Sequence, residues 1–137
     1  IRILSKALRP ITIRLFPEVP EDHPAIGSIV LNMAANILGL GNAATPMGLK
    51  AMEELQELNP KKDTATNAMC IFLAINTSSV QLILPATVVA LMGAAANQIF
   101  ITTILATGMS TVAAIFAVKF FEKLNRFKIN TKDSNDR

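Results

Sequence analysis

The sequence predicts an all-α integral membrane protein with a re-entrant helical hairpin and a broken transmembrane helix. Of the 137 residues, 51% are apolar, and no Asp, Glu, Lys or Arg occurs in residues 25–49 or 64–118. A soluble domain places charges along the outer faces of its helices, whereas one membrane crossing needs roughly 20 consecutive apolar residues. Glycines, prolines and polar runs interrupt both uncharged blocks, which is typical of segments that turn or break inside a bilayer.

Residues 1–16 predict an amphipathic helix at the membrane interface, or the exit end of a span that precedes them, because apolar and basic residues follow separate helical stripes. The apolar stripe is Leu4, Leu8, Ile11 and Leu15. Three prolines between residues 17 and 24 end this helix. We interpret His23 in that segment as a solvated residue, because no cluster of Cys, His and carboxylate ligands accompanies it.

Residues 25–43 and 45–58 predict the two arms of the hairpin. Gly39 and Gly41 suit a tight turn, and Thr45 followed by Pro46 suits the cap and first turn of a second helix. Each unpaired backbone group costs several kcal/mol in lipid. We therefore expect the hairpin tip to be buried in protein or to face a water-filled site.

Residues 64–92 are too long for one simple crossing and contain a polar run at 76–81. Pro85 cannot donate a hydrogen bond to the carbonyl of Gln81, four residues earlier. This pattern predicts a break near 76–81, with two half-helices whose ends face each other.

The rest of the chain predicts a neutral loop at 93–98, a last transmembrane helix at 99–121 and a polar tail at 125–137. We assign residues 1–124 to one membrane domain. We expect this domain to be incomplete at its N-terminus, because the sequence begins with Ile1.

The distribution of charge predicts how the chain crosses the membrane. Connectors 1–23, 50–63 and 119–137 contain several Lys or Arg, and connector 93–98 contains none. If residues 25–43 turned back through 45–58, all basic connectors would share the cytoplasmic face, as the positive-inside tendency favours. We therefore expect a multi-pass protein, and we interpret the basic C-terminal segment as a membrane-edge anchor that binds no nucleic acid.

The polar residues of the two interrupted segments predict a substrate-binding cavity near the middle of the membrane. The candidate residues are Asn32, Asn36, Asn42, Thr45, Asn76, Thr77, Ser78, Ser79 and Gln81. Amide and hydroxyl groups also join membrane helices, at roughly 0.6 kcal/mol per contact. We assign that packing role to Thr103, Thr107 and Thr111, whereas both interpretations stay open for Asn32 and Asn36.

No motif of an enzyme is present: the sequence contains no P-loop, no dinucleotide-binding fingerprint and no zinc-protease motif. We therefore expect no catalytic residue, no metal and no cofactor. The uncharged blocks also contain no carboxylate or histidine, the groups that proton-driven carriers usually bury. Any transport would be passive, or its coupling residues would lie elsewhere.

The strings "NILGLGNAATPMGLKAM" and "ATNAMCIFLAINTSSVQL" resemble the nucleoside recognition, or Gate domain, family of bacterial membrane proteins, to which spore maturation proteins belong. The resemblance extends from about residue 8 to about residue 123. It implies a bacterial plasma-membrane protein that acts in spore maturation and core dehydration. It also implies a transport-related site for a nucleoside-like solute, and a second Gate-domain partner of the spore maturation protein B type. The alternative is a structural scaffold or assembly factor that moves no solute.

Overall fold

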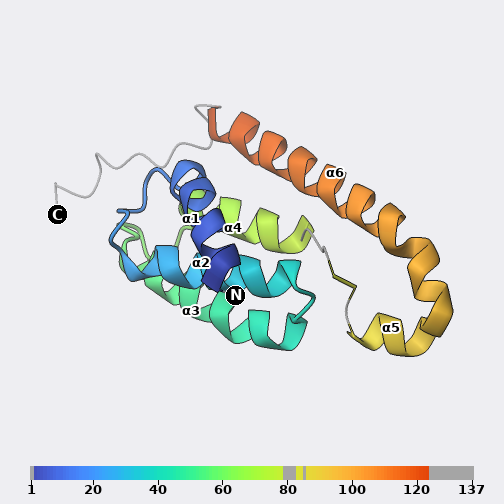
Figure 1. The fold of residues 1–137 in the computed structure, drawn as a ribbon. Helices are drawn as coiled ribbons and strands as arrows, with labels where there is room; N and C mark the ends of the chain where they lie inside the picture. The colour runs from blue at the N-terminus through green and yellow to red at the C-terminus, as the bar shows by residue number, and fades with distance from the viewer. Residues whose placement is uncertain (1, 79–82, 85, 124–137) are drawn as a thin grey trace, which may run out of the picture.

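The computed structural model describes residues 2–78, 83–84 and 86–123, and every regular element in these ranges is a helix. The elements are α1 (Arg2–Leu15), α2 (Pro24–Ile37), α3 (Gly41–Glu57), α4 (Asn67–Ser78), α5 (Ala86–Met92), the 3-10 turn η1 (Gly93–Ala95) and α6 (Ala96–Lys123). Figure 1 shows α2 and α3 as an antiparallel pair, with α1 and α4 packed on it and α6 running along α4. The all-α prediction is confirmed, and the predicted tail at 125–137 lies outside the described residues.

Helix α1 occupies the predicted segment but turns a different stripe inward. Leu8 and Thr12 are buried, whereas Ile11 is 52% exposed. Burial of Thr12 is possible because its hydroxyl donates to the Leu8 carbonyl at 3.0 Å and so leaves no unpaired donor. Positions 4, 8 and 12 define the stripe that faces α2, and Ile11 lies about 100° away from Thr12 around the helix. The position of α1 at a membrane interface stays a prediction.

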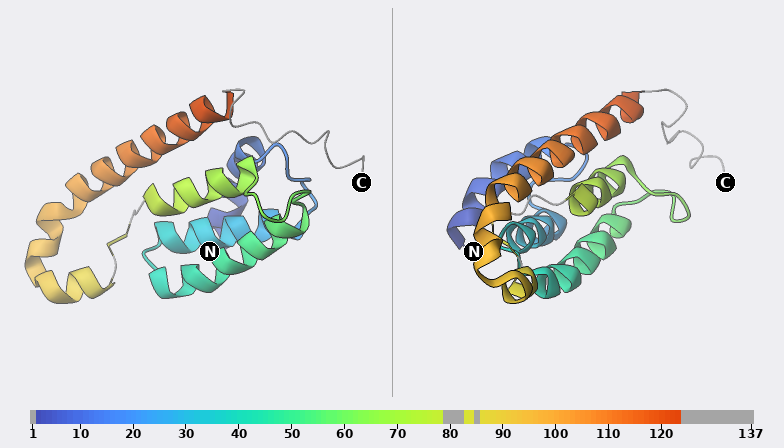
Figure 2. Two further views of the ribbon diagram at one scale, coloured as in Figure 1. Left: turned by 180° about the vertical axis from the view of Figure 1, so that it is seen from behind. Right: turned by 90° about the vertical axis from the view of Figure 1, so that its right-hand side faces the viewer.

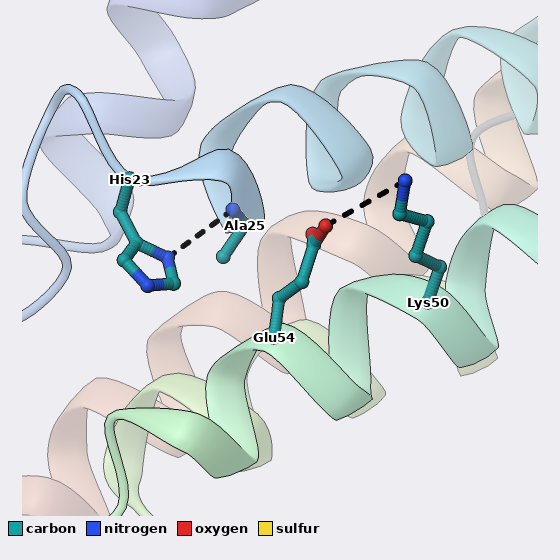
Figure 3. A network of polar contacts seen from close by, with 4 residues as sticks. All are labelled: His23, Ala25, Lys50 and Glu54. Carbon is teal, nitrogen blue, oxygen red and sulfur yellow. Dashed lines mark hydrogen bonds and ion pairs between the residues drawn. The ribbon is translucent and has the colours of Figure 1, made fainter.

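His23 has a structural role that the sequence interpretation missed. Its Nδ1 accepts a hydrogen bond from the backbone N–H of Ala25 at 3.3 Å, at the start of α2 (Figure 3). Pro24 occupies the first helical position, where its missing N–H costs nothing. His23 is thus a half-buried helix cap and not a solvated side chain.

The turn between α2 and α3 consists of Leu38, Gly39 and Leu40. Gly39 has a φ of +70°, which a glycine adopts without steric cost. The N–H groups of all three residues donate to carbonyls of the last turn of α2, at 2.9–3.1 Å. The backbone donors of the turn are therefore paired within the hairpin itself.

Helix α3 begins at Gly41, four residues before the predicted start. The Leu40 carbonyl accepts from the N–H groups of both Ala43 and Ala44 at 2.9 Å, and this pairing starts the helix early. Thr45 therefore does not cap the helix, and its hydroxyl donates to the Gly41 carbonyl at 3.2 Å. Pro46 lies inside α3, where it removes one helical donor, the partner of the Asn42 carbonyl.

The second arm ends at Glu57, one residue before the predicted Leu58, and Asn59 follows its cap. This side chain is buried, and its Nδ2 donates to the Thr64 carbonyl at 2.8 Å while its Oδ1 accepts from the N–H of Lys61 at 2.9 Å. These bonds to its own loop offer the backbone an alternative to a further helical turn. Asn59 thereby fixes the connection from α3 to α4.

Two separate helices, α4 and α5, occupy the stretch for which a broken span was predicted. Ile83 and Leu84 between them are not helical, and the N–H of Ile83 donates to the carbonyl of Ile37 at the hairpin turn, at 3.2 Å. Residues 79–82 and 85 lie outside the described residues, so the break at Gln81 and Pro85 stays a prediction. That α4 and α5 are halves of one membrane segment also stays a prediction.

The predicted loop at 93–98 was wrong. Gly93–Ala95 form η1 and α6 begins at Ala96, so the last helix is also longer than the predicted 99–121. Three consecutive alanines explain the difference, since alanine has the highest helix propensity of all residues.

One stretch of the described residues, Thr87–Lys123, is long and apolar enough to cross a membrane. It has 37 residues, and its most apolar 18-residue window has a mean hydropathy of 1.9 and is only 6% buried. Helices α2 and α4 are apolar but have 14 and 12 residues. Since 14 helical residues span about 21 Å against a hydrocarbon core of about 30 Å, the multi-pass arrangement and the re-entrant position of the hairpin stay predictions.

The charged connections lie at one end of the molecule. Figures 1 and 2 show the α1–α2 turn, the α3–α4 loop and the last turns of α6 at this end, and the hairpin turn and α5 at the opposite end. The α1–α2 turn (16–23) and the α3–α4 loop (58–66) both contain charged residues, whereas the hairpin turn contains none. The fold thus separates a charged end from an uncharged end, and the membrane face of each connector stays a prediction.

Replacing Glu54 by Leu is expected to leave the free energy of unfolding unchanged or raise it by about 1 kcal/mol. Glu54 is 9% exposed and points from α3 toward α2 (Figure 3). Its Oε1 lies 3.8 Å from the exposed Lys50 Nζ, and its Oε2 is buried with no hydrogen-bond partner among the described residues. Leucine of similar volume removes that unpaired buried oxygen.

Thermal unfolding in detergent measures the effect of Glu54→Leu. Lys50→Ala is the control, and it is expected to change the free energy of unfolding by less than about 0.5 kcal/mol. A clear loss of stability in Glu54→Leu would contradict the prediction.

Candidate functional site

Three asparagine side chains join α2, α3 and α4 through a continuous series of hydrogen bonds. Asn32 Nδ2 donates to the Ala44 carbonyl of α3 at 2.8 Å. Asn36 Nδ2 donates to Asn32 Oδ1 at 3.3 Å and to Asn76 Oδ1 at 3.0 Å. Asn76 Nδ2 in turn donates to the Phe72 carbonyl of α4 at 2.9 Å. The series therefore connects the backbones of the two outer helices through the side chains of the middle one.

The local sequence explains why these amides meet. Asn32 and Asn36 are four residues apart and so lie on the same face of α2. Asn32, which is 2% exposed, reaches α3 because Gly48 has no side chain: a Cβ at that position would lie 2.9 Å from Asn32 Nδ2. A glycine within a helix costs up to about 1 kcal/mol relative to alanine, and here it allows the close approach of the two helices.

An open pocket of about 350 Å³ lies beside this series. Asn32, Asn36, Asn76 and Thr45 supply its polar lining. Its apolar lining includes Leu49, Met52, Phe72 and Leu73. A small polar molecule would thus meet amide groups on one side and aliphatic and aromatic carbon on the other.

The paired and unpaired donors and acceptors of Asn32 and Asn36 show which hydrogen bonds this pocket can form with a ligand. An asparagine has two N–H donors and one carbonyl acceptor. Both N–H groups of Asn36 are used by Asn32 and Asn76, and its Oδ1 has no partner within the described part of the chain. One N–H of Asn32 is used by Ala44 and the second is not. The pocket therefore combines a spare acceptor with a spare donor, one helical turn apart.

The structure brings together four of the predicted site residues and separates three others. Asn32, Asn36, Thr45 and Asn76 line one pocket, whereas Asn42 is exposed and does not line it. Thr77 and Ser78 line a different cavity, of about 450 Å³, between α4 and α6. Their hydroxyls donate to carbonyls of their own helix at 2.9 and 2.8 Å. Ser79 and Gln81 lie outside the described residues.

Helical rotation explains this separation. Consecutive residues of an α-helix are about 100° apart, so Thr77 and Ser78 cannot share the face of Asn76. The sequence interpretation treated the polar run as one group because it expected a break there, but α4 continues to Ser78. It also missed Gly48 and Phe72. An isolated glycine inside a helical pattern is a signal for close packing and could have identified the first of these.

Comparisons with known proteins identify the family of this chain. The family model described as "Nucleoside recognition" (Gate) matches residues 1–96, which include the hairpin, α4 and the pocket. Spore maturation protein A of Bacillus subtilis (strain 168) is 46% identical over 123 residues, which cover 87% of this chain and 62% of that protein. The chain thus spans less than two thirds of that relative, and no solved structure matches it. Since the family model covers more than half of its length, the chain belongs to the nucleoside recognition (Gate) family and is a homologue of spore maturation protein A.

Proposed function

We propose that the chain is part of a transport-related membrane subunit whose pocket between α2, α3 and α4 binds a polar, nucleoside-like solute. The observation that carries this proposal is the series Asn32–Asn36–Asn76 at the edge of an open pocket. Nucleobase edges present donors and acceptors side by side, and asparagine amides pair with such edges. The volume of about 350 Å³ lies within the usual range of small-molecule sites, about 300–1,000 Å³.

The hairpin supports a position of this pocket inside the membrane. The three N–H groups of the turn are paired with carbonyls of α2, so the turn exposes few unpaired donors to lipid. The turn also contacts Ile83, between α4 and α5, so the two interrupted segments meet. Secondary transporters form substrate sites near the bilayer midplane from segments of this kind. In our proposal the hairpin is re-entrant, and α4 and α5 belong to one broken span.

The relative that the chain resembles is named for spore maturation. We propose that this protein acts in the same process, in core dehydration, as a multi-pass protein of a bacterial plasma membrane. We further propose that it works with a second Gate-domain protein of the spore maturation protein B type, without nucleic acid, and that it catalyses no reaction. Helix α6 exposes apolar side chains such as Leu105, Met109 and Phe116, a surface suited to lipid or to such a partner.

Asn36→Ala is expected to lower solute flux about tenfold or more, because it removes the spare acceptor and two hydrogen bonds of the series. The measurement is nucleoside flux in vesicles that contain the full-length protein and its Gate-domain partner. Asn42→Ala is the matched control, since Asn42 is exposed and lies outside the pocket. A nucleoside-dependent thermal shift, lost in Asn36→Ala and kept in Asn42→Ala, tests binding independently of transport. Normal flux and an unchanged shift in Asn36→Ala would refute the site.

The alternative function is a structural scaffold or assembly factor. The observation that favours it is the position of α6, which packs on α4 and leaves most of its surface exposed. In that case the amide series would only join helices. Met109→Ala with Phe116→Ala would then abolish co-purification of the partner, and no nucleoside would shift the thermal midpoint. Retained co-purification together with a nucleoside-dependent shift would exclude the scaffold.

A further inference from the structure

A separate cavity of about 450 Å³ lies between α1 and the start of α2, and it shares no residue with the amide pocket. Lys6 and Arg9 of α1 line it, together with Glu21 and Asp22 of the turn before α2. All four side chains are exposed, and no ion pair joins the two basic to the two acidic groups in the described structure. Both signs of charge therefore face one cavity without neutralising each other by direct contact.

The lining of this cavity changes from charged to apolar along α2. After His23 and Pro24, the helix contributes Ile26, Val30 and Leu31. Ile26 and Val30 are buried and Leu31 is exposed, so the apolar lining of the cavity reaches the outside of the molecule at Leu31. The charged part of the cavity begins at the α1–α2 turn, which lies at the charged end of the fold (Figure 1). A ligand that fits this lining has charges of both signs at one end and an apolar tail at the other.

We propose that this cavity binds a phospholipid whose headgroup carries both a phosphate and a free ammonium group, as phosphatidylethanolamine does. Lys6 and Arg9 contact the phosphate, since Lys and Arg at a membrane surface attract lipid phosphates. Glu21 and Asp22 accept hydrogen bonds from the ammonium group. The first part of an acyl chain lies along Val30 and Leu31, and the remainder follows the exposed apolar surface.

The chemistry of the lining excludes two common headgroups as the preferred ligand. Phosphatidylglycerol has a phosphate but no cation to pair with Glu21 and Asp22. Phosphatidylcholine has a cation, but its trimethylammonium group has no N–H to donate. The cavity holds roughly 15 water volumes of about 30 Å³ each, enough for a headgroup and the start of its chains. This inference does not depend on the proposed transport function.

The test is lipid binding to the full-length protein in detergent, measured by native mass spectrometry with dioleoyl-phosphatidylethanolamine and dioleoyl-phosphatidylglycerol. We expect the ethanolamine lipid to bind roughly tenfold more tightly. Lys6→Ala with Arg9→Ala weakens both lipids by roughly tenfold. Glu21→Gln with Asp22→Asn weakens only the ethanolamine lipid and removes the preference. Arg14→Ala and Asp63→Asn are controls for charge, because these exposed residues do not line the cavity.

Three results would overturn the proposal. The first is an equal or stronger affinity of the unmodified protein for the glycerol lipid. The second is a preference for ethanolamine that survives Glu21→Gln with Asp22→Asn. The third is competition by free phosphoethanolamine at the concentration of the lipid, which would identify a site for the soluble headgroup only. The thermal midpoint of each variant checks its folding, and the comparison of lipids on the unmodified protein decides the first result without any variant.

Discussion

Gly39→Ala is expected to lower the free energy of unfolding by about 3 kcal/mol or more, through two separate effects. The φ of +70° at this position costs an alanine about 1–2 kcal/mol. The added Cβ would also lie 2.6 Å from the Ile83 carbonyl oxygen, a backbone atom that no side-chain rotation can move. The hydrogen bond from the N–H of Ile83 to the Ile37 carbonyl, at 3.2 Å, would be lost in the resulting shift.

The thermal midpoint of the full-length protein in detergent measures this effect, and nucleoside flux measures its functional result. Gly108→Ala in α6 is the matched control, because its Cβ would meet no atom within 4 Å. That change is expected to be neutral or to stabilise the helix by up to about 1 kcal/mol. If Gly39→Ala were as stable as Gly108→Ala, the close contact between the hairpin turn and Ile83 would not exist in the protein.

Asn32→Ala is expected to lower the free energy of unfolding by about 2–3 kcal/mol. Asn32 is buried, and its loss removes the side-chain hydrogen bond to the Ala44 carbonyl and leaves one N–H of Asn36 without its partner. Gly48→Ala is expected to cost about 1–2 kcal/mol, because the new methyl group occupies the space of Asn32 Nδ2.

The two changes should not add. In the double variant, the methyl group introduced by Gly48→Ala enters the space that the Asn32 amide vacates, so the total loss should fall below the sum of the single losses by about 1 kcal/mol. Thermal unfolding of the four proteins of this cycle gives the coupling energy. Gly27→Ala with Asn32→Ala is a suitable control pair, since a Cβ at Gly27 would meet nothing within 4 Å. Strictly additive losses for Gly48 and Asn32 would contradict the packing described here.

Those helices that coincide with uncharged runs of the sequence were predictable from composition alone. The uncharged runs and the prolines between residues 17 and 24 were enough for α2, α4 and α6. The start of α3 was not predictable from Thr45 and Pro46, because it depends on the Leu40 carbonyl accepting two N–H groups. The side of α1 that packs on α2 was not predictable for a related reason, because the side that a helix buries depends on its neighbour.

Only those features of the site that depend on the geometry of a single helix were predictable from the sequence. The spacing of Asn32 and Asn36 places them on one face whatever surrounds them. The choice of Asn76 over Thr77 and Ser78 requires knowing which face of α4 turns toward α2, and this is a tertiary property. The two interpretations left open for Asn32 and Asn36 are both compatible with the result, since these side chains join helices and also line a pocket.

The bond between Ile83 and Ile37 has a mechanical consequence. The peptide that leads into α5 is fastened to the end of α2 and fits closely over Gly39. This contact joins two segments that lie more than 40 residues apart in the sequence, the turn after α2 and the stretch that precedes α5. A substitution that displaces one of these segments is therefore expected to disturb the backbone of the other.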